Sequence, residues 1–314
     1  MIVAKQTMPG LVRGLWCNMC GTRLPGGGVA GPGVSASAHW VEWREPSGRV
    51  AGWCLCAQCY QERLRCAACG LHVGEQAVMI ESERYIYCHH CFELRPRCDT
   101  CSHPVGTIYW TRPDGRTLCD RCQSTAVSDP AHAYALYRRV RADLARWPGM
   151  TLSRSCQLKL VSRRQLVSLI EKSSLHNLDA DSRGRCFGLF IREGDQRTIF
   201  VEYGLPRIVL LEVLAHEYAH AWQSEHCPPE DIPQVQEGFA EWVAYRLLEG
   251  WGCKRRSQRM LRRDDIYGRG LKLMLQWEQE VGIAGVFHRV REPLERPDVS
   301  KALVPQPKAQ YKGV

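Results

Sequence analysis

The chain has 314 residues, of which 45% are hydrophobic and 24% are charged. This composition is typical of globular proteins and excludes a wholly disordered, collagenous or coiled-coil chain. The length predicts two or three domains, and the formal net charge of +9 does not by itself indicate nucleic-acid binding.

Cysteine is the residue that stands out in the first third of the chain. Thirteen of the 17 cysteines lie between Cys17 and Cys122, and twelve of them form six Cys-x-x-Cys pairs. Two thiolates separated by two residues can converge on one metal ion, whereas a disulfide framework gives no reason for this gap to recur. The pairs predict three closed, structural zinc sites: Cys17, Cys20, Cys56 and Cys59; Cys66, Cys69, Cys88 and Cys91; Cys98, Cys101, Cys119 and Cys122.

These pairs divide residues 1–125 into three LIM-like zinc-ribbon modules, at about 15–62, 63–94 and 95–125. The segments between the pairs of the second and third modules are predicted β-hairpins, because β-branched and aromatic residues flank polar turns such as Asp114-Gly115. The first module contains a glycine-rich insert at 26–33, which we expect to be a loop. Four further residues could each replace a thiolate or simply pack: His39, Cys54, His89 and His90.

The remaining two-thirds of the chain has mixed α and β patterns. Pro130 and the apolar spacing after it predict a helix within 126–150, either a linker helix or the first helix of the next domain. A strand at 157–162, a helix at 163–173 and a hairpin with strands near 185–192 and 197–203 follow. We therefore expect an α+β domain over 151–292 and a loosely ordered tail over 293–314.

The segment after this hairpin is a predicted helix that contains the pattern HExxH. His216 and His220 are four residues apart and share one helix face, so both imidazoles can bind one zinc ion. Glu217 follows the first histidine and is close enough to activate a water molecule as a general base. A buried histidine helix packed against an acidic helix is the alternative interpretation.

A catalytic zinc site needs a third protein ligand and an open fourth position. Glu237 begins the motif Glu-Gly-Phe-Ala, which after HExxH resembles the gluzincin metallopeptidases, whose third ligand is a glutamate of a following helix. The resemblance assigns Glu237 as that ligand. Glu241 shares its helix face and is placed to orient a ligand imidazole. We expect Gly238 to let this helix approach the HExxH helix closely.

Four segments occur in the same order as in a plant family, the organ-size-restricting, ubiquitin-activated "DA-one" metallopeptidases: residues 199–207, the HEYAHAW helix, the QEGFAEW helix and residues 267–283. The resemblance covers about residues 55–292 and is strong over 198–292. It implies LIM-type modules followed by a gluzincin domain, with His216, His220 and Glu237 as zinc ligands and Glu217 as the catalytic base.

Two features depart from this family. Six residues separate consecutive zinc units here, whereas a LIM pair has two. Only 16 residues precede Cys17, and they contain no ubiquitin-interacting helix. We therefore expect a bacterial or stand-alone homologue without ubiquitin-dependent activation.

Three weaker predictions concern the surroundings of the site. The strand RTIFVEY (197–203) is either an edge strand that accepts substrate or an ordinary interior strand. Tyr267 is the first choice to stabilise an oxyanion, ahead of Tyr203 and His288. The basic run at 254–263 is interpreted as a solvated helix face or loop rather than a nucleic-acid patch.

The leading functional hypothesis is a zinc-dependent endopeptidase with one catalytic and three structural Zn²⁺ ions and no other cofactor. Its zinc modules would recruit protein substrates or bind protein regulators. The main alternative is an adaptor with a silent or partner-activated peptidase domain. A nucleic-acid-binding protein is disfavoured, because the modules lack interleaved basic and aromatic residues. The absence of a signal peptide or an 18-residue apolar run predicts a cytoplasmic protein without a membrane anchor.

Overall fold

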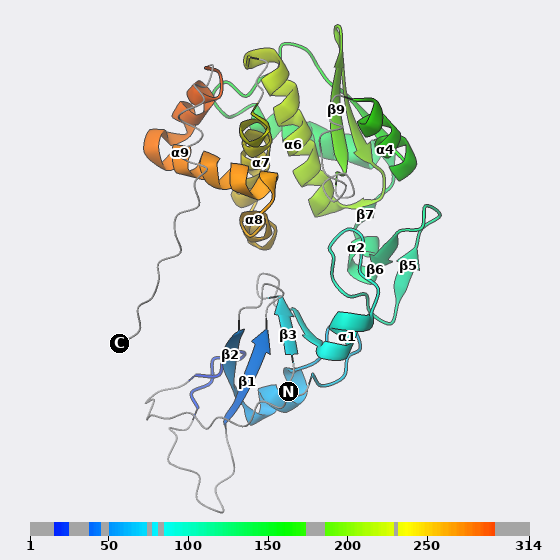
Figure 1. Cartoon of the computed structure of the whole chain (residues 1–314), viewed down its shortest axis with the longest axis vertical. Coiled ribbons are helices and arrows are strands. Elements are labelled where there is room, and N and C mark those ends of the chain that lie inside the picture. The colour runs from blue at the N-terminus through cyan, green and yellow to red at the C-terminus, as the bar shows by residue number, and fades with distance from the viewer. Residues whose placement is uncertain are drawn as a thin grey trace, which may run out of the picture. The chain divides into compact units, whose positions relative to one another are not determined.

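The computed structural model describes residues 16–24, 38–44, 50–73, 77–80, 85–173, 186–228 and 232–292. The chain forms two compact units, Met1–Asp120 and Arg121–Val314, and both are drawn in Figure 1. The predicted loop at 26–33 and the predicted tail at 293–314 lie outside the described residues. Among the described helices, none is long and apolar enough to span a membrane.

The N-terminal unit is built from short strands and single helical turns. Strands β1 (Ala38–Arg44), β2 (Val50–Cys56), β3 (Ala77–Ile80) and β4 (Tyr85–Cys88) form one sheet in the order β2-β1-β3-β4. As predicted, β3 and β4 form an antiparallel hairpin, and so do β5 (Tyr109–Thr111) and β6 (Thr117–Cys119). The last cysteine of each module lies in a helical element: Cys59 begins the π-helical turn η1 (Cys59–Arg63), and Cys91 and Cys122 lie in the helices α1 (His89–Leu94) and α2 (Asp120–Ser124).

The first cysteine pair of every module lies in the same kind of turn. Isolated antiparallel bridges close these turns at Trp16–Arg23, Arg65–His72 and Arg97–Pro104. In each turn the residue after the second cysteine has a positive φ: Gly21 at 75°, Gly70 at 73° and Ser102 at 61°. Glycine adopts this conformation without strain, and its N–H can then donate to the carbonyl of the first cysteine, as the N–H of Gly21 does at 2.9 Å.

The C-terminal unit combines helices with a small mixed sheet (Figure 1). Strand β10 (Gln196–Glu202) lies between β8 (Gln157–Val161), which is parallel to it, and β9 (Gly188–Glu193), which is antiparallel. Helix α4 (Arg163–Lys172) follows β8, and the two-residue strands β7 (Ala126–Val127) and β11 (Leu205–Pro206) pair with each other. The remaining helices are α3 (Pro130–Leu144), α6 (Arg207–His226), α7 (Pro233–Gly250), α8 (Lys254–Leu261) and α9 (Ile266–Arg289).

Helix α6 is the centre of this unit and contacts α3, α7, β9 and β10. Because it is apolar most of the way round, it can be buried on several sides at once. The helix predicted within 126–150 is α3, and its packing supports the second of its two interpretations, the first helix of the C-terminal domain: Ala133, Tyr137, Val140 and Leu144 are fully buried in the core that α6 shares with α7 and α9. A helix with a complete apolar face is stable only where that face is covered.

Gly238 permits a close approach of α7 to α9. The expectation that it lets α7 approach the HExxH helix α6 closely is therefore wrong. A Cβ atom on Gly238 would lie 2.7 Å from the Cα of Gly270, and one on Gly270 would lie 2.5 Å from the Cα of Gly238. Real Cβ atoms do not approach backbone this closely. The two glycines therefore allow α7 and α9 to pack closely at Gly238, the residue that follows Glu237 on α7.

Candidate metal centre

The twelve paired cysteines come together in the three predicted groups of four. In each group the ligand atoms lie within 4.8 Å of one another. One Sγ–Sγ distance in each group is 3.9 Å for Cys20 and Cys56, 4.0 Å for Cys69 and Cys88, and 3.7 Å for Cys101 and Cys119. Since Zn–S bonds of about 2.3 Å in a tetrahedron put sulfur atoms about 3.8 Å apart, these groups fit zinc.

The four possible substitute ligands do not join these groups where the structure describes them. Cys54 is a buried residue of the N-terminal core, and burial raises the pKa of its thiol. His89 and His90 begin α1 and are exposed. The side chain of His39 lies outside the described residues.

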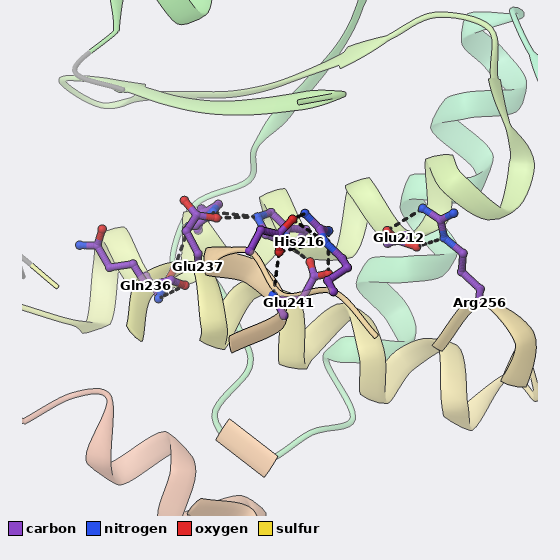
Figure 2. Close-up of polar contacts among 11 residues, drawn as sticks. Glu212, His216, Gln236, Glu237, Glu241 and Arg256 are labelled. Carbon is purple, nitrogen blue, oxygen red and sulfur yellow. Dashed lines mark hydrogen bonds and ion pairs between the residues drawn. The ribbon is translucent and has the colours of Figure 1, made fainter. Parts of the chain in front are cut away.

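A fourth group joins two helices of the C-terminal unit. The Nε2 atoms of His216 and His220 are 3.1 Å apart, and Oε2 of Glu237 lies 3.2 Å from the first and 3.5 Å from the second. Figure 2 shows Glu237 of α7 facing His216 of α6. Zinc bonds of about 2.0–2.1 Å to nitrogen and oxygen place tetrahedral ligands about 3.3 Å apart. The three atoms therefore fit one zinc ion, with the fourth position left to water or substrate.

Each imidazole has an orienting partner on its other nitrogen. Nδ1 of His216 lies 3.3 Å from Oε2 of Glu241, and Nδ1 of His220 lies 2.9 Å from Oε1 of Gln223. An N–H that donates to such an oxygen leaves the Nε2 lone pair free for a metal. Gln223 was not identified from the sequence as a partner of His220, although a residue three positions later on a helix lies on the same face. Its Nε2 also donates to the carbonyl of Gln236 at 3.1 Å, next to Glu237.

The charges of this group depend on one another. Although burial opposes ionisation of Glu237, the two histidines lower the pKa of its carboxyl well below the ordinary value. Burial also disfavours the charged form of His216, but hydrogen bonds to Glu237 and Glu241 outweigh it and raise the pKa of the imidazole. A buried group of carboxylates and imidazoles that stabilises positive charge is a suitable site for a metal cation.

Glu217 lies beside this group and is almost fully buried. Burial raises the pKa of its carboxyl, against the effect of His216 and His220, which brings it closer to the range of an efficient general base. The backbone N–H of Phe190 in β9 donates to this carboxylate. Gly188, which begins β9, leaves the necessary room, since a Cβ there would lie 2.8 Å from Oε1 of Glu217.

The strand that borders the site is β9, so the edge-strand interpretation of residues 197–203 is wrong. In the described part of the sheet, β10 pairs on both sides and β9 only with β10. The sequence hardly distinguishes the central strand from the edge strand. Ile199 and Val201 of β10 are fully buried, whereas Phe190 and Ile191 of β9 are only partly buried, yet both strands contain similar runs of hydrophobic residues.

Of the three oxyanion candidates, Tyr267 is the one that lies at this group. Its ring centroid is 5.8 Å from that of His216, and burial raises the pKa of its phenol. His288 is exposed near the end of α9 and pairs with Glu292 at 3.2 Å. Tyr203 follows β10, where its N–H donates to the carbonyl of Val161 at 3.0 Å.

The basic run at 254–263 is only partly solvated, which corrects the sequence interpretation. Arg256 makes a two-pronged ion pair with the buried Glu212 of α6, as Figure 2 shows. Arg263 contacts the buried Glu241 at 3.1 Å. Two of the basic residues thus neutralise carboxylates on the inward faces of α6 and α7.

Comparisons with known proteins find relatives for part of this chain. Residues 140–263, which include the four grouped side chains His216, Glu217, His220 and Glu237, match the family model described as "DA1-like: Protein DA1". The chain is 30% identical over 170 residues to "Protein DA1-related 2" of Arabidopsis thaliana. This alignment covers 45% of this chain and 32% of the relative. No solved structure gives a significant match.

Two further relatives match a similar share of the chain. "LIM domain-containing protein HDR3" of Oryza sativa subsp. japonica is 27% identical over 175 residues, which are 46% of this chain and 34% of the relative. "Protein DA1" of Arabidopsis thaliana is 26% identical over 174 residues, 46% of this chain and 32% of the relative. The match thus spans about a third of the length of these curated relatives. Over residues 140–263, this chain is thus similar to proteins of the DA1 family.

Proposed function

We propose that this chain is a zinc-dependent endopeptidase that cleaves protein substrates. One observation carries the proposal: three ligand atoms from α6 and α7 converge at 3.1–3.5 Å, with the buried carboxylate of Glu217 beside them. Two imidazoles and one carboxylate are the donor set of open zinc sites in peptidases. Zinc in such a site supplies a Lewis acid for a carbonyl oxygen and lowers the pKa of water.

The chain's own residues would perform the remaining steps. Glu217 would accept the proton of the attacking water and later return it to the leaving amine, because one buried carboxylate can act first as base and then as acid. The edge of β9 that has no strand partner among the described residues would align an extended peptide by adding it as a strand. The phenol of Tyr267 would donate a hydrogen bond to the oxyanion.

The N-terminal unit would recruit protein substrates or bind protein regulators through its zinc modules. The third module supports this part of the proposal, because Ile108, Tyr109 and Trp110 are 66%, 46% and 48% exposed, and exposed aromatic groups favour protein contacts. The same observation favours the second candidate function, an adaptor whose peptidase domain is silent or activated by a partner. Free thiolates persist in a reducing compartment, and we extend the proposal to a cytoplasmic protein.

The substitution Glu217→Gln tests the mechanism. The amide keeps the size of the side chain but cannot accept the proton of water, so peptide hydrolysis should fall about 100-fold or more. The measurement is turnover of an unfolded protein substrate by the zinc-loaded full chain, with zinc content and melting temperature as controls. Unchanged turnover in this variant would exclude the mechanism. A wild-type chain that binds its zinc ions but cleaves nothing would favour the adaptor.

A further inference from the structure

Arg263 lies in the turn between α8 and α9 and contacts both neighbours of His216. Its Nη1 is 3.1 Å from Oε1 of Glu241, whose other oxygen faces Nδ1 of His216 at 3.3 Å. Its guanidinium carbon lies 4.5 Å from the ring centroid of Tyr267. Because the Tyr267 ring is 5.8 Å from the imidazole of His216, these contacts close a ring of four side chains.

The contact with Glu241 fixes a buried carboxylate from both sides. Glu241 is only 2% exposed, and a buried charge without a counter-charge is strongly unfavourable. With the guanidinium on one oxygen and the imidazole on the other, the carboxylate has a single orientation in which both partners are satisfied. Without Arg263, Glu241 would lose the partner that holds it against His216.

The contact of Arg263 with Tyr267 is held in place by residues at the start of α9. Nη2 of Arg263 lies 2.8 Å from Oδ2 of Asp265, and Oδ1 of Asp265 accepts the N–H of Gly268 at 3.0 Å as the N-cap of α9. Gly268 allows the backbone of Arg263 to lie against this turn, since a Cβ there would be 2.1 Å from the Arg263 carbonyl oxygen. The guanidinium is therefore held over the ring by the same helix that carries Tyr267.

We propose that Arg263 is the positioning residue of the metal centre, which holds Glu241 against His216 and Tyr267 beside it. The inference rests on the proposed zinc site. It assigns a role to a residue of the basic run at 254–263 for which the sequence offered no functional reason. Arg263 acts through its neighbours and does not itself bind the metal or substrate.

Arg256 provides a matched comparison on the neighbouring helix. It too pairs with a buried glutamate, Glu212, and the two arginine side chains are 18% and 30% exposed. Glu212, however, lies one helical turn before His216, and its two-pronged ion pair is with Arg256 rather than with a ligand imidazole. Loss of Arg256 should therefore lower stability without changing the metal centre.

The experiment measures zinc affinity of the His216–His220–Glu237 site by chelator competition, on the full chain with its cysteine sites loaded. Arg263→Met should weaken zinc binding about 10- to 100-fold, the range for loss of a group that orients a ligand. Arg263→Lys keeps the charge but not the planar fork, so its affinity should lie between those of the wild type and Arg263→Met. Arg256→Met should lower the melting temperature but keep the wild-type zinc affinity.

A double-mutant cycle with Glu241→Gln separates positioning from general destabilisation. If Arg263 acts through Glu241, the two losses of zinc affinity should not add, because the second substitution removes an interaction that is already lost. Fully additive losses, or an unchanged zinc affinity in Arg263→Met, would overturn the inference. Should Arg263→Met fail to fold, Arg263→Lys and Glu241→Gln provide the same cycle.

The zinc readout also distinguishes this inference from the proposed function. A wild-type chain that binds zinc only at its cysteine clusters would overturn both. A chain that fills the fourth site but cleaves no protein would contradict the endopeptidase, while the ranking of the Arg263 variants would still decide the role of Arg263.

Discussion

Glu237 and Glu241 lie one turn apart on α7, but their surroundings differ. Oε2 of Glu237 faces the Nε2 atoms of both histidines, whereas Glu241 faces Nδ1 of His216 and the guanidinium of Arg263. The same four-residue spacing therefore gives one carboxylate among the candidate ligands and one behind them.

The two alanine substitutions should differ in size. Glu237→Ala removes one of three protein ligands and should abolish zinc binding at this site. Glu241→Ala removes an orienting group, so zinc affinity should fall about 10- to 100-fold while the site can still be filled. Zinc titration of both variants checks this order, and a variant Glu241→Ala that loses the metal while Glu237→Ala keeps it would reverse the two roles.

At the level of helices and strands, regular patterns in the sequence predicted the elements well. The spacing of His216 and His220 indicated one helix face, and the pattern around residues 157–203 indicated the strands and helix that the structure contains. These predictions succeed because they depend on local periodicity.

Features that depend on which elements pack together could not be predicted. The order β8-β10-β9 follows from long-range pairing, and Val201 looks alike in an edge or a central strand. The burial of α3 depends on α6, whose first residue, Arg207, comes 63 residues after Leu144, the last residue of α3. Likewise, nothing in the sequence near Gly238 pointed to Gly270 or indicated that Arg263 would meet Glu241.

The crossing of α7 and α9 gives a prediction about stability. Gly238→Ala would place a methyl group 2.7 Å from the backbone of Gly270. Because the clashing atoms belong to the backbone, the clash cannot be relieved by rotation of a side chain. Overpacking of this kind costs about 1–3 kcal/mol, so the unfolding midpoint of the C-terminal unit in urea should fall. The zinc affinity should fall as well, because Glu237 precedes the displaced backbone.

Gly250→Ala is the matched control on the same helix. Among the described residues outside its own helical turn, no atom lies within 4 Å of the position that its Cβ would take, and alanine is the better helix former. This variant should be as stable as the wild type or slightly more stable. If Gly238→Ala behaved in the same way, α7 and α9 would not be in close contact in solution.

Across the whole molecule, the described residues contain four groups that fit zinc, and they differ in kind. Three are closed sets of four cysteines and one is an open set of two histidines and a glutamate. The N-terminal unit consists of short strands and turns between its cysteine pairs, so its folding should depend on metal, since small modules of this type fold with their zinc.

Metal analysis of the full chain, purified without added zinc, should therefore find four zinc ions per chain. A mild chelator should remove one ion first, because the open site exchanges its ligands through the fourth position whereas a four-thiolate site has none. Loss of this ion should abolish hydrolysis and leave the N-terminal unit folded, as followed by circular dichroism. Removal of the other three at higher chelator concentration should unfold the N-terminal unit. A content of two ions or fewer would contradict the assignment of the cysteine clusters, and early loss of the thiolate-bound ions would contradict the distinction between closed and open sites.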